Sequence, residues 1–326
     1  MGVAVQVAIL PRLEEIQAAA EVVYRTMSPT PQYSWPLLNA RAGCEVWVKH
    51  ENHTPVGAFK IRGGLVYMDW LRRERPEATT IISATRGNHG QSLACAGALY
   101  GLRVVIVVPF GNSREKNAAM RAQGAELIEF GDDFQAATDH AAQLQTEHGW
   151  HRVKAYDPRL VLGVATYALE YLSAVPELDT VYVPVGMGTG IAGMLAARDA
   201  LGLKTKIVGV VSSSAPAQAL SFAKGEVVEH AATTAIADGV ACRRPDAGAL
   251  EIVRAGVERF VEVDDEEVED AMRAYFSDTH NVAEGAGAIG LAALLKDRAS
   301  GGGRVGTVLC DGNVDSDVFA RVLGKR

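Results

Sequence analysis

The sequence predicts an α/β fold built on parallel sheets, and two observations lead to this prediction. Short β-branched runs recur along the 326-residue chain, and stretches with helical periodicity and Ala-rich faces separate them. Runs that are apolar throughout are typical of parallel strands buried on both faces. Their alternation with helical stretches indicates parallel strands that are joined by helical crossovers.

The expected elements follow one another in a regular order. The strands are expected at 79–83, 104–108, 127–130, 181–185, 207–211 and 305–309. The helices are expected at 88–100, 113–123, 134–147, 161–174, 190–201 and 265–278. Because no Pro/Gly/Ser-rich linker divides the chain, a second domain is expected as an insertion. We expect a large domain made of residues 1–76 and 157–326 and a small inserted domain made of residues 77–156.

Composition narrows the class of partner. Apolar residues make up 48% of the chain, enough to bury a substantial core. The net charge of −7 and the pI of about 5.7 give no electrostatic reason for binding nucleic acid or an anionic membrane. The longest apolar runs, such as 104–110, are too short to cross a bilayer. We therefore expect a small-molecule ligand, with no nucleic acid and no membrane partner.

The N-terminus and the cysteines indicate a reducing compartment. The segment MGVAVQVAILPRLEE has neither the basic lead nor the small-residue cleavage site of a secretory signal, so we expect a cytoplasmic protein. The four cysteines are widely separated and form no CxxC, which indicates reduced thiols rather than disulfides or a zinc site. No HxxxH pair occurs either, and no metal site is expected.

The first stretch whose residues suit catalysis or cofactor binding is VWVKHENHTPVGAFKIRGG, in which a strand-like run ends before Phe59 and Lys60. A lysine that binds a carbonyl carbon must lose solvent so that its pKa falls. Ala58 and Phe59 offer such an apolar setting. Alone, the motif leaves open the far commoner alternative of a solvated surface lysine.

The second stretch is SATRGNHGQSLA at 83–94, which follows an expected strand and opens an Ala-rich helix. Such a junction directs backbone N–H groups and the positive end of the helix dipole at an anion, and glycines allow close approach. A substrate carboxylate suits this place. The alternative is an ordinary turn, with Asn88 as the N-cap and His89 packed or capping.

The third stretch, PVGMGTGIAGM at 184–194, repeats the order of strand, Gly-rich loop and helix. Its N–H donors and the Thr189 hydroxyl are what a phosphate monoester needs. The loop partly imitates a dinucleotide fingerprint, but no acidic ribose partner ends the next strand. No lysine follows it as in a P-loop, so hydrolysis of a nucleoside triphosphate is not expected.

The fourth stretch is TVLCDGNVD at 307–315, where an expected strand ends at Cys310 and turns through Gly312. Ligands of open α/β sheets bind at the carboxyl ends of the strands, and a thiol there can meet a heterocyclic nitrogen. The alternative is a buried structural cysteine, which is the commoner case.

Together and in this order, the four stretches resemble the fold type II pyridoxal-phosphate enzymes (the tryptophan synthase beta-like type), particularly threonine dehydratase, serine dehydratase and serine racemase. The resemblance runs from Trp35 to Asp315 and includes EKNAAMRAQGAELIEFG and IADGV at 236–240. It implies two open parallel-sheet domains, pyridoxal 5'-phosphate as the cofactor, and a homodimer.

The resemblance also implies roles for individual residues. Lys60 resembles the lysine that holds the cofactor as a Schiff base, and Phe59 the residue beside the ring. The other implied cofactor contacts are Asn88 at the 3-oxygen, the phosphate loop Gly186, Met187, Gly188, Thr189 and Gly190, Gly239 and Glu284 near the ring, and Cys310 at the pyridine nitrogen. The implied substrate-binding residues are Ser83, Thr85, Arg86, Gly87, Asn88 and His89.

Three departures from the family pattern carry information. Met187 and Thr189 interrupt a loop that is usually all glycine, but N–H groups do the binding. Val211 and Ala217 stand where metal-binding members carry acids, so we expect no divalent-metal site. Arg86 stands where racemases place a serine base. Because a guanidinium cannot be deprotonated in a protein, Arg86 favours elimination over racemisation. It is expected to pair with a substrate carboxylate or a pocket acid, or else to point to solvent.

The implied reaction is the α,β-elimination of a 3-hydroxy L-amino acid, such as threonine, serine, phenylserine or hydroxyaspartate, to a 2-keto acid and ammonia. Lys60 would remove the α-proton, and a neutral Cys310 thiol would leave the pyridine nitrogen unprotonated, which suits rapid elimination. Two alternatives stay open. One is a racemase or β-replacement synthase on the same scaffold, and the other is a non-enzymatic nucleotide-binding module that uses the Gly186 loop.

Overall fold

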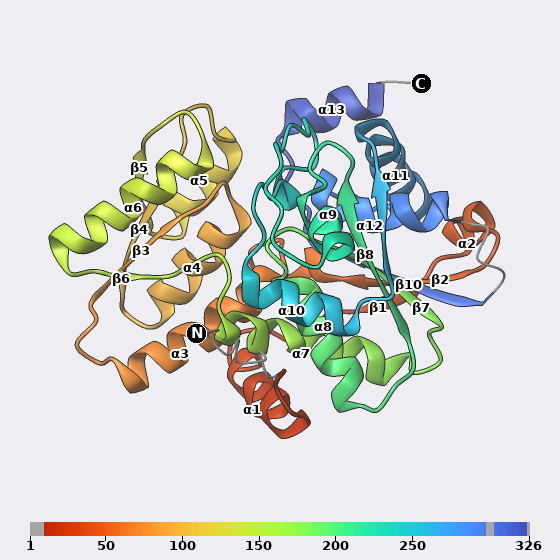
Figure 1. The fold of residues 1–326 in the computed structure, drawn as a ribbon, viewed down its shortest axis with the longest axis horizontal. Helices are drawn as coiled ribbons and strands as arrows, with labels where there is room; N and C mark the ends of the chain where they lie inside the picture. Colours follow the sequence, from red (N-terminus) through yellow and green to blue (C-terminus); the bar gives the residue numbers. More distant parts are fainter. Residues whose placement is uncertain (1–9, 298–302, 325–326) are drawn as a thin grey trace.

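The chain forms two lobes, each built on its own sheet, as Figure 1 shows. The computed structural model describes residues 10–297 and 303–324. Within these residues, one sheet has six strands in the order β1-β2-β10-β7-β8-β9, and the other has four in the order β5-β4-β3-β6. The predicted α/β class with two parallel-sheet units is confirmed.

The six-stranded sheet brings together strands from both ends of the chain. Its members are β1 (Gln32–Ser34), β2 (Glu45–His50), β7 (Thr180–Pro184), β8 (Lys206–Ser212), β9 (Arg259–Val263) and β10 (Arg304–Leu309). Its neighbouring strands run parallel except for β1 and β2, which are antiparallel. Residues 35–44 are too short a connection for a parallel crossover, so the edge strand β1 departs from the all-parallel prediction.

The four-stranded sheet is parallel throughout. Its strands are β3 (Thr80–Ala84), β4 (Arg103–Val108), β5 (Glu126–Glu129) and β6 (His151–Arg152), with the helices α4 (Asn88–Leu99), α5 (Arg114–Ala122) and α6 (Phe134–His148) between them. These elements lie inside residues 77–156, and the exact limits of an inserted domain stay a prediction.

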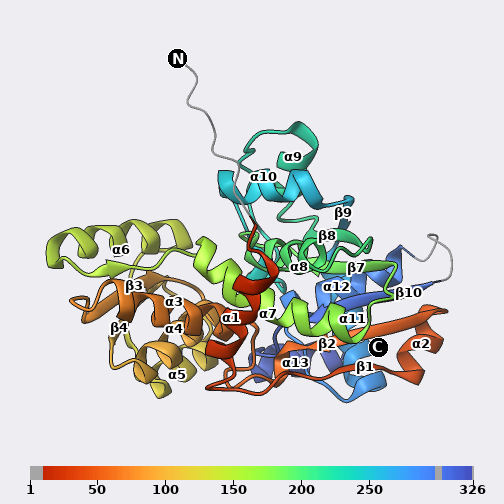
Figure 2. The same ribbon diagram turned by 90° about the horizontal axis from the view of Figure 1, so that it is seen from below.

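Helices cover both faces of the six-stranded sheet, as a parallel sheet requires. One face packs on α11 (Asp265–Thr279) and α12 (Gly285–Lys296), the other on α7 (Pro158–Ala174) and α8 (Thr189–Ala200). Figure 2 shows α1 (Leu13–Val23) lying against α7. The remaining helical elements are α2 (Pro36–Ala42), η1 (Glu51–His53), α3 (Lys60–Glu74), α9 (Ala217–Lys224), η2 (Asp238–Val240), α10 (Ala247–Gly256) and α13 (Ser316–Gly324).

Every strand and helix that the sequence predicts is present, with boundaries that differ by a few residues. The prediction missed other elements, and α12 shows why. Its sequence, GAGAIGLAALLK, is buried almost all round between the sheet and α11. Since every face is apolar, no helical period separates a buried stripe from a solvent stripe.

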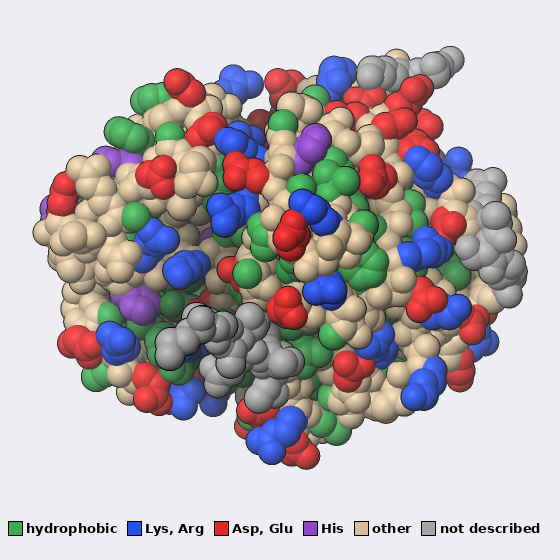
Figure 3. All heavy atoms as spheres, viewed as in Figure 1, with side chains coloured by type: hydrophobic (Ala, Val, Ile, Leu, Met, Phe, Trp, Pro, Cys, Tyr) green, Lys and Arg blue, Asp and Glu red, His purple; other side chains and the backbone are tan. Residues whose placement is uncertain are grey.

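The surface carries charges of both signs. On the face viewed in Figure 3, Lys and Arg side chains are interspersed with Asp and Glu side chains. This mixture follows from a composition of 32 basic and 39 acidic residues. That face therefore presents no broad basic patch of the kind that binds a polyanion.

No helix within the described ranges is long and apolar enough to cross a membrane. The same residues contain no group of three His, Cys, Asp or Glu side chains placed to hold a metal ion. Residues 1–9, which contributed to the expectation of a cytoplasmic protein, lie outside the described residues.

Candidate active site

Lys60 is the first residue of α3, and the turn before it is bonded to the end of β10. The Phe59 N–H donates to the Cys310 carbonyl oxygen at 2.9 Å, and the Gly312 N–H donates to the Gly57 carbonyl oxygen at 3.0 Å. From the other lobe, the Ser92 hydroxyl of α4 donates to the carbonyl oxygen of Lys60 at 2.6 Å. These bonds place Lys60 where the two lobes meet, at the carboxyl end of the central strand β10.

The Lys60 amine lies beside an aromatic ring and is partly shielded from solvent. Its Nζ is 4.8 Å from the centroid of the buried Phe59 ring, which makes an edge contact with Tyr167. Loss of solvent lowers the pKa of Lys60, and the nearby Cys310 and Asp311 oppose this shift. A lowered pKa is what a carbonyl-binding or proton-abstracting amine requires. This setting differs from that of the solvated surface lysine left open as an alternative.

A buried ionic network anchors the first turn of α3, two residues beyond Lys60. Arg62 is fully buried, with Nε 2.7 Å from Glu51 Oε2 and an Nη atom 2.6 Å from Glu170 Oε1. Lys49 Nζ lies 2.5 Å from Glu170 Oε2, so two cations face two carboxylates. The sequence analysis missed this network, although Arg62 stands in the same KIRGG run as Lys60.

The glycine loop between β7 and α8 packs tightly against Phe59 and η2. A Cβ atom on Gly186 would lie 2.8 Å from the Gly239 carbonyl oxygen, and one on Gly190 would lie 3.7 Å from the Phe59 ring. Gly188 has φ +96, and a Cβ there would come within 2.9 Å of Ala249 Cβ. The backbone N–H groups that open α8 are thus held beside the residue that precedes Lys60.

The two side chains that interrupt this loop have partners of their own. The Cys242 thiol donates to Met187 Sδ at 3.6 Å, and the Thr189 hydroxyl donates to the Ala155 carbonyl oxygen at 3.4 Å. The Gln218 amide donates to the carbonyl oxygen of Gly186 at 2.7 Å. Contacts with Cys242, Ala155 and Gln218, which lie outside the loop, therefore hold residues 186–190 in place.

Asn88 and Glu284 form the centre of a polar cluster between the lobes. Asn88 Nδ2 donates to Glu284 Oε1 at 2.8 Å, and Lys116 Nζ lies 2.6 Å from Glu284 Oε2. Asn313 Nδ2 donates to Asn88 Oδ1 at 2.9 Å. Because its side chain is used here and Gly87 precedes the helix, Asn88 is not the side-chain cap of an ordinary turn. Lys116 and Asn313 were missed, although each stands in a stretch that carries the resemblance.

Cys310 lies at the end of β10 beside a second buried acid. The Cys310 thiol donates to Asp311 Oδ2 at 3.3 Å and lies 3.5 Å from the Ala286 carbonyl oxygen. Burial raises the pKa of Cys310 well above its ordinary value, with the Asp311 carboxylate adding to the shift. Burial also raises the pKa of Asp311, and the neighbouring Glu284 raises it further. Both groups therefore have raised pKa values in this buried part of the site, and the sequence analysis did not foresee Asp311.

The side chains of the predicted substrate-binding stretch differ in what they contact. The Ser83 hydroxyl donates to the Val153 carbonyl oxygen at 2.8 Å, and Thr85 Oγ1 accepts from the Gly87 N–H at 3.2 Å. Arg86 donates to Asp238 Oδ1 at 2.6 Å, which is the pocket-acid pairing among the expected outcomes. His89 is buried, and desolvation together with the Lys60 charge lowers its pKa to about 3.

The residues present fit pyridoxal 5'-phosphate. Lys60 offers a half-buried amine whose pKa is lowered by desolvation, and the loop at Gly186 and Gly188 forms a cradle that a Cβ atom would fill. Within residues 10–297 and 303–324, the buried ring nitrogen Nε2 of His89 and the buried amide nitrogen Nε2 of Gln91 have no hydrogen-bond partner. A lysine, a phosphate cradle and unused buried polar groups are what a cofactor with a bound substrate carboxylate requires.

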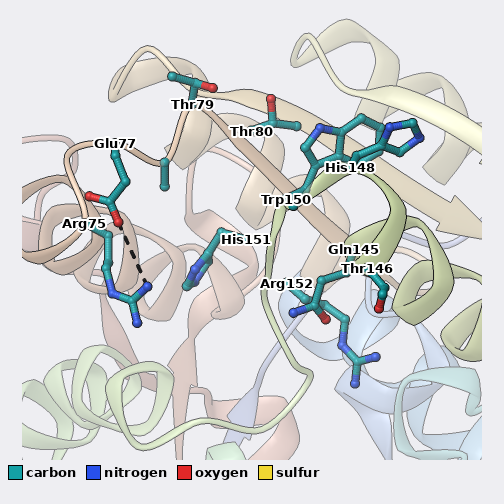
Figure 4. Close-up of a pocket in the computed structure, with 12 residues that line it drawn as sticks. Arg75, Glu77, Thr79, Thr80, Gln145, Thr146, His148, Trp150, His151 and Arg152 are labelled. Atoms are coloured by element: carbon teal, nitrogen blue, oxygen red, sulfur yellow. Dashed lines mark ion pairs between the residues drawn. The ribbon is translucent and has the colours of Figure 1, made fainter.

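A cavity of about 640 Å³ lies elsewhere, at the other end of the four-stranded sheet. Figure 4 shows it between the start of β3 and the end of α6, with the rings of His148 and Trp150 stacked at one side and the Arg75–Glu77 ion pair at the other. None of the predicted site residues lines it. Parallel α/β sheets bind ligands at the opposite, carboxyl end of their strands, where Lys60 lies.

Comparison with known proteins defines the class first. Residues 23–311 match the sequence model of the family described as pyridoxal-phosphate dependent enzyme. The threonine deaminase of T.th. superposes with a TM-score of 0.87 at 29% identity, covering 94% of this chain and 99% of that one. Maize serine racemase superposes with a TM-score of 0.88 at 26% identity, covering 97% and 98%. The chain therefore belongs to the pyridoxal-phosphate-dependent enzyme family, fold type II.

Curated relatives narrow the class to its threonine/serine dehydratase branch. The L-threonine ammonia-lyase of Thermotoga maritima is 31% identical over 96% of this chain and 78% of its own length. The L-threo-3-hydroxyaspartate ammonia-lyase of Saccharomyces cerevisiae is 30% identical over 97% of both chains. The chain is a pyridoxal-phosphate-dependent lyase of this branch, which confirms the predicted cofactor and enzyme class.

Proposed function

We propose that this chain converts a 3-hydroxy L-amino acid (threonine, serine or a related one such as phenylserine or hydroxyaspartate) to a 2-keto acid and ammonia. The single observation that carries the proposal is the Lys60 amine with its lowered pKa, held at the end of β10 beside a neutral Cys310 thiol. The names of the lyase relatives support the same reaction class.

The predicted contacts give each part of the cofactor a partner. Lys60 would hold its aldehyde carbon, the loop from Gly186 to Gly190 its phosphate, and Asn88 its 3-oxygen. Phe59, Gly239 and Glu284 would lie around the ring, with Cys310 at the pyridine nitrogen. When bound, the cofactor supplies an electron sink for the pair left by the α-proton.

Lys60 Nζ is the group that takes the α-proton. Arg86 cannot accept a proton, and its guanidinium is already bonded to Asp238. His89, with a pKa of about 3, is a poor base at neutral pH. The proton therefore leaves toward Lys60 alone, which favours a lyase over a racemase. The bonds that break are Cα–H and Cβ–O, and the hydroxyl departs as water with the proton that Lys60 has taken. The enamine that is released tautomerises to a 2-imino acid, and a water molecule hydrolyses this to the 2-keto acid and ammonia.

The remaining protein groups position the substrate. The N–H groups that open α4, preceded by Gly87, offer an anion site for the substrate carboxylate, and Ser83, Thr85 and His89 belong to the same proposed stretch.

We also propose a cytoplasmic homodimer with a small domain at 77–156. Analytical ultracentrifugation of the holoenzyme tests the dimer, and a single monomeric species would contradict it.

A substrate panel tests the proposed reaction. Ammonia and 2-keto acid are measured from L-threonine, L-serine, phenylserine and threo-3-hydroxyaspartate, for the wild type, K60A and the control K154A, whose lysine is exposed. We expect K60A to lose turnover of every substrate and K154A to keep it. Turnover by K60A, or net formation of D-serine from L-serine without ammonia, would contradict the proposal.

A further inference from the structure

Arg86 and Asp238 form an ion pair that joins the two lobes. An Nη atom of Arg86, in the turn before α4, lies 2.6 Å from Oδ1 of Asp238, the first residue of η2. The two side chains are 44% and 35% exposed, so the pair is open to solvent on one side. The two residues are 152 positions apart in the chain.

The pair lies directly beside the polar cluster of the proposed active site. Two residues after Arg86, Asn88 donates to Glu284 Oε1 at 2.8 Å. The residue after Asp238 is Gly239, where a Cβ atom would lie 3.3 Å from the same Oε1 atom. Both partners of the pair are therefore held next to the carboxylate of Glu284.

The charges around the pair cancel. Lys116 neutralises Glu284, with Nζ 2.6 Å from Oε2. Asp238 neutralises Arg86 in the same way, and its charge also reaches Lys116. A substrate side chain that faces this pair therefore meets no net positive charge. A second substrate carboxylate would have to displace Asp238 and then lie beside its negative charge.

We propose that Asp238 sets the substrate class of this enzyme by occupying the Arg86 guanidinium, so that substrates with an uncharged side chain are preferred over dicarboxylates. The inference rests on the proposed function of the same site. It predicts that removal of the Asp238 charge frees a planar guanidinium whose fork matches a carboxylate in a bidentate arrangement.

The test compares two substrates in three variants. The ratio of kcat/KM for threo-3-hydroxyaspartate to that for L-serine is measured for the wild type, D238N and the double variant R86Q/D238N. We expect the ratio to rise on the order of tenfold in D238N, because a charge-assisted hydrogen bond to a carboxylate is gained. In the double variant the ratio falls back to about the wild-type value, since the guanidinium is absent.

A binding measurement gives a second readout that needs no turnover. Dissociation constants of succinate and butyrate are measured on the holoenzyme from the cofactor absorbance. We expect D238N to bind succinate on the order of tenfold more tightly relative to butyrate. The matched control is E126Q, which breaks the similarly exposed Arg103–Glu126 pair of the small lobe and leaves both ratios unchanged.

The outcomes separate this inference from the proposed function. If the wild type turns over L-serine but D238N shows neither the rise in the kcat/KM ratio nor tighter succinate binding, Asp238 does not set the substrate class. If the wild type prefers hydroxyaspartate to serine, the inference is also overturned, while the ammonia-lyase function stands. If the wild type acts on neither substrate, the proposed function falls and the inference falls with it.

Discussion

The backbone N–H of Phe59 donates a hydrogen bond to the carbonyl oxygen of Cys310, and the two atoms lie 2.9 Å apart. This bond joins the residue before the proposed Schiff-base lysine to the residue proposed at the pyridine nitrogen. Because β10 lies inside the sheet between β2 and β7, both residues share one rigid support. The backbone thereby fixes the spacing between the two protein groups that are proposed to hold opposite ends of the cofactor ring.

Gly188 is predicted to contribute to cofactor affinity. The G188A variant must place a Cβ atom 2.9 Å from Ala249 Cβ at φ +96, so the loop has to shift. We expect the Kd for pyridoxal 5'-phosphate to weaken by about tenfold, since a strain of ~1–2 kcal/mol acts on the loop. Titration of the apoenzyme, followed by absorbance, measures this constant.

Gly202 provides the matched control. It also has a positive φ, +65, but no described atom lies within 4 Å of a Cβ built there. G202A should cost ~1–2 kcal/mol of stability and leave the cofactor Kd unchanged. Equal cofactor affinity in G188A, G202A and the wild type would refute the role of the loop.

Arg62 is predicted to be a large contributor to stability. In R62M the buried Glu170 carboxylate keeps Lys49, whereas the buried Glu51 carboxylate loses its cation and keeps the Thr30 hydroxyl as a donor. We expect the free energy of unfolding of the holoenzyme in urea to fall by about 3–5 kcal/mol, the usual cost of breaking a buried pair from one side. The control R121M breaks the exposed Arg121–Glu129 pair and should cost less than about 1 kcal/mol. Similar losses in both variants would contradict the account.

Lys116 and Glu284 are predicted to be strongly coupled. K116M leaves the Glu284 carboxylate buried without its cation, and E284Q leaves the Lys116 ammonium without its anion. Each should lower the free energy of unfolding by about 3 kcal/mol, whereas the double variant K116M/E284Q should lose less than the sum. A double-mutant cycle from urea unfolding measures the coupling. Strict additivity would mean that the two side chains do not interact.

The stability of the fold is predicted to fall as the pH drops below about 6.5. Burial lowers the pKa of His50 to about 4, and neutral His50 Nε2 accepts a hydrogen bond from the Trp35 indole at 3.1 Å. The pKa of His89 is lowered to about 3. In the unfolded chain both rings bind protons near pH 6.5, so the unfolded state gains protons first and acid favours it.

Urea unfolding of the holoenzyme at pH 7.5, 6 and 5 measures this dependence. Each histidine should contribute up to about 1.4 kcal/mol per pH unit below its unfolded pKa. The variant H50Q keeps an acceptor for Trp35 but cannot titrate, so its slope should be shallower. A stability that stays constant from pH 7.5 to 5, or an identical slope in H50Q, would contradict this prediction.

The sequence predicted the features that depend on local pattern. Strands such as β4 are apolar along almost their whole length because both faces are covered, and the glycine-rich turn at 186–190 follows a strand and allows close approach to the backbone. Four such stretches in one order were enough to predict the fold and the cofactor, which are confirmed, whereas Lys60 as the cofactor's attachment site stays a prediction.

The missed features depend on contacts between distant parts of the chain. Lys116 is a charged residue type, which is seldom buried, and nothing local placed it beside Glu284. Asp311 follows Cys310 directly in the sequence, but its burial next to Glu284 depends on the packing of distant segments. The partner of Arg86 is 152 positions away, and only the packing of the two lobes brings Asp238 to it. The sequence pattern therefore predicts candidate site residues more readily than it predicts the partners of their side chains.

The central claim is that Lys60 holds the cofactor, and one measurement tests it directly. The holoenzyme is reduced with borohydride and digested, and the peptides are examined by mass spectrometry. We expect a single phosphopyridoxyl adduct, on Lys60, with loss of the visible absorbance. An adduct on another lysine, such as Lys116 or Lys49, or no adduct at all, would contradict the account.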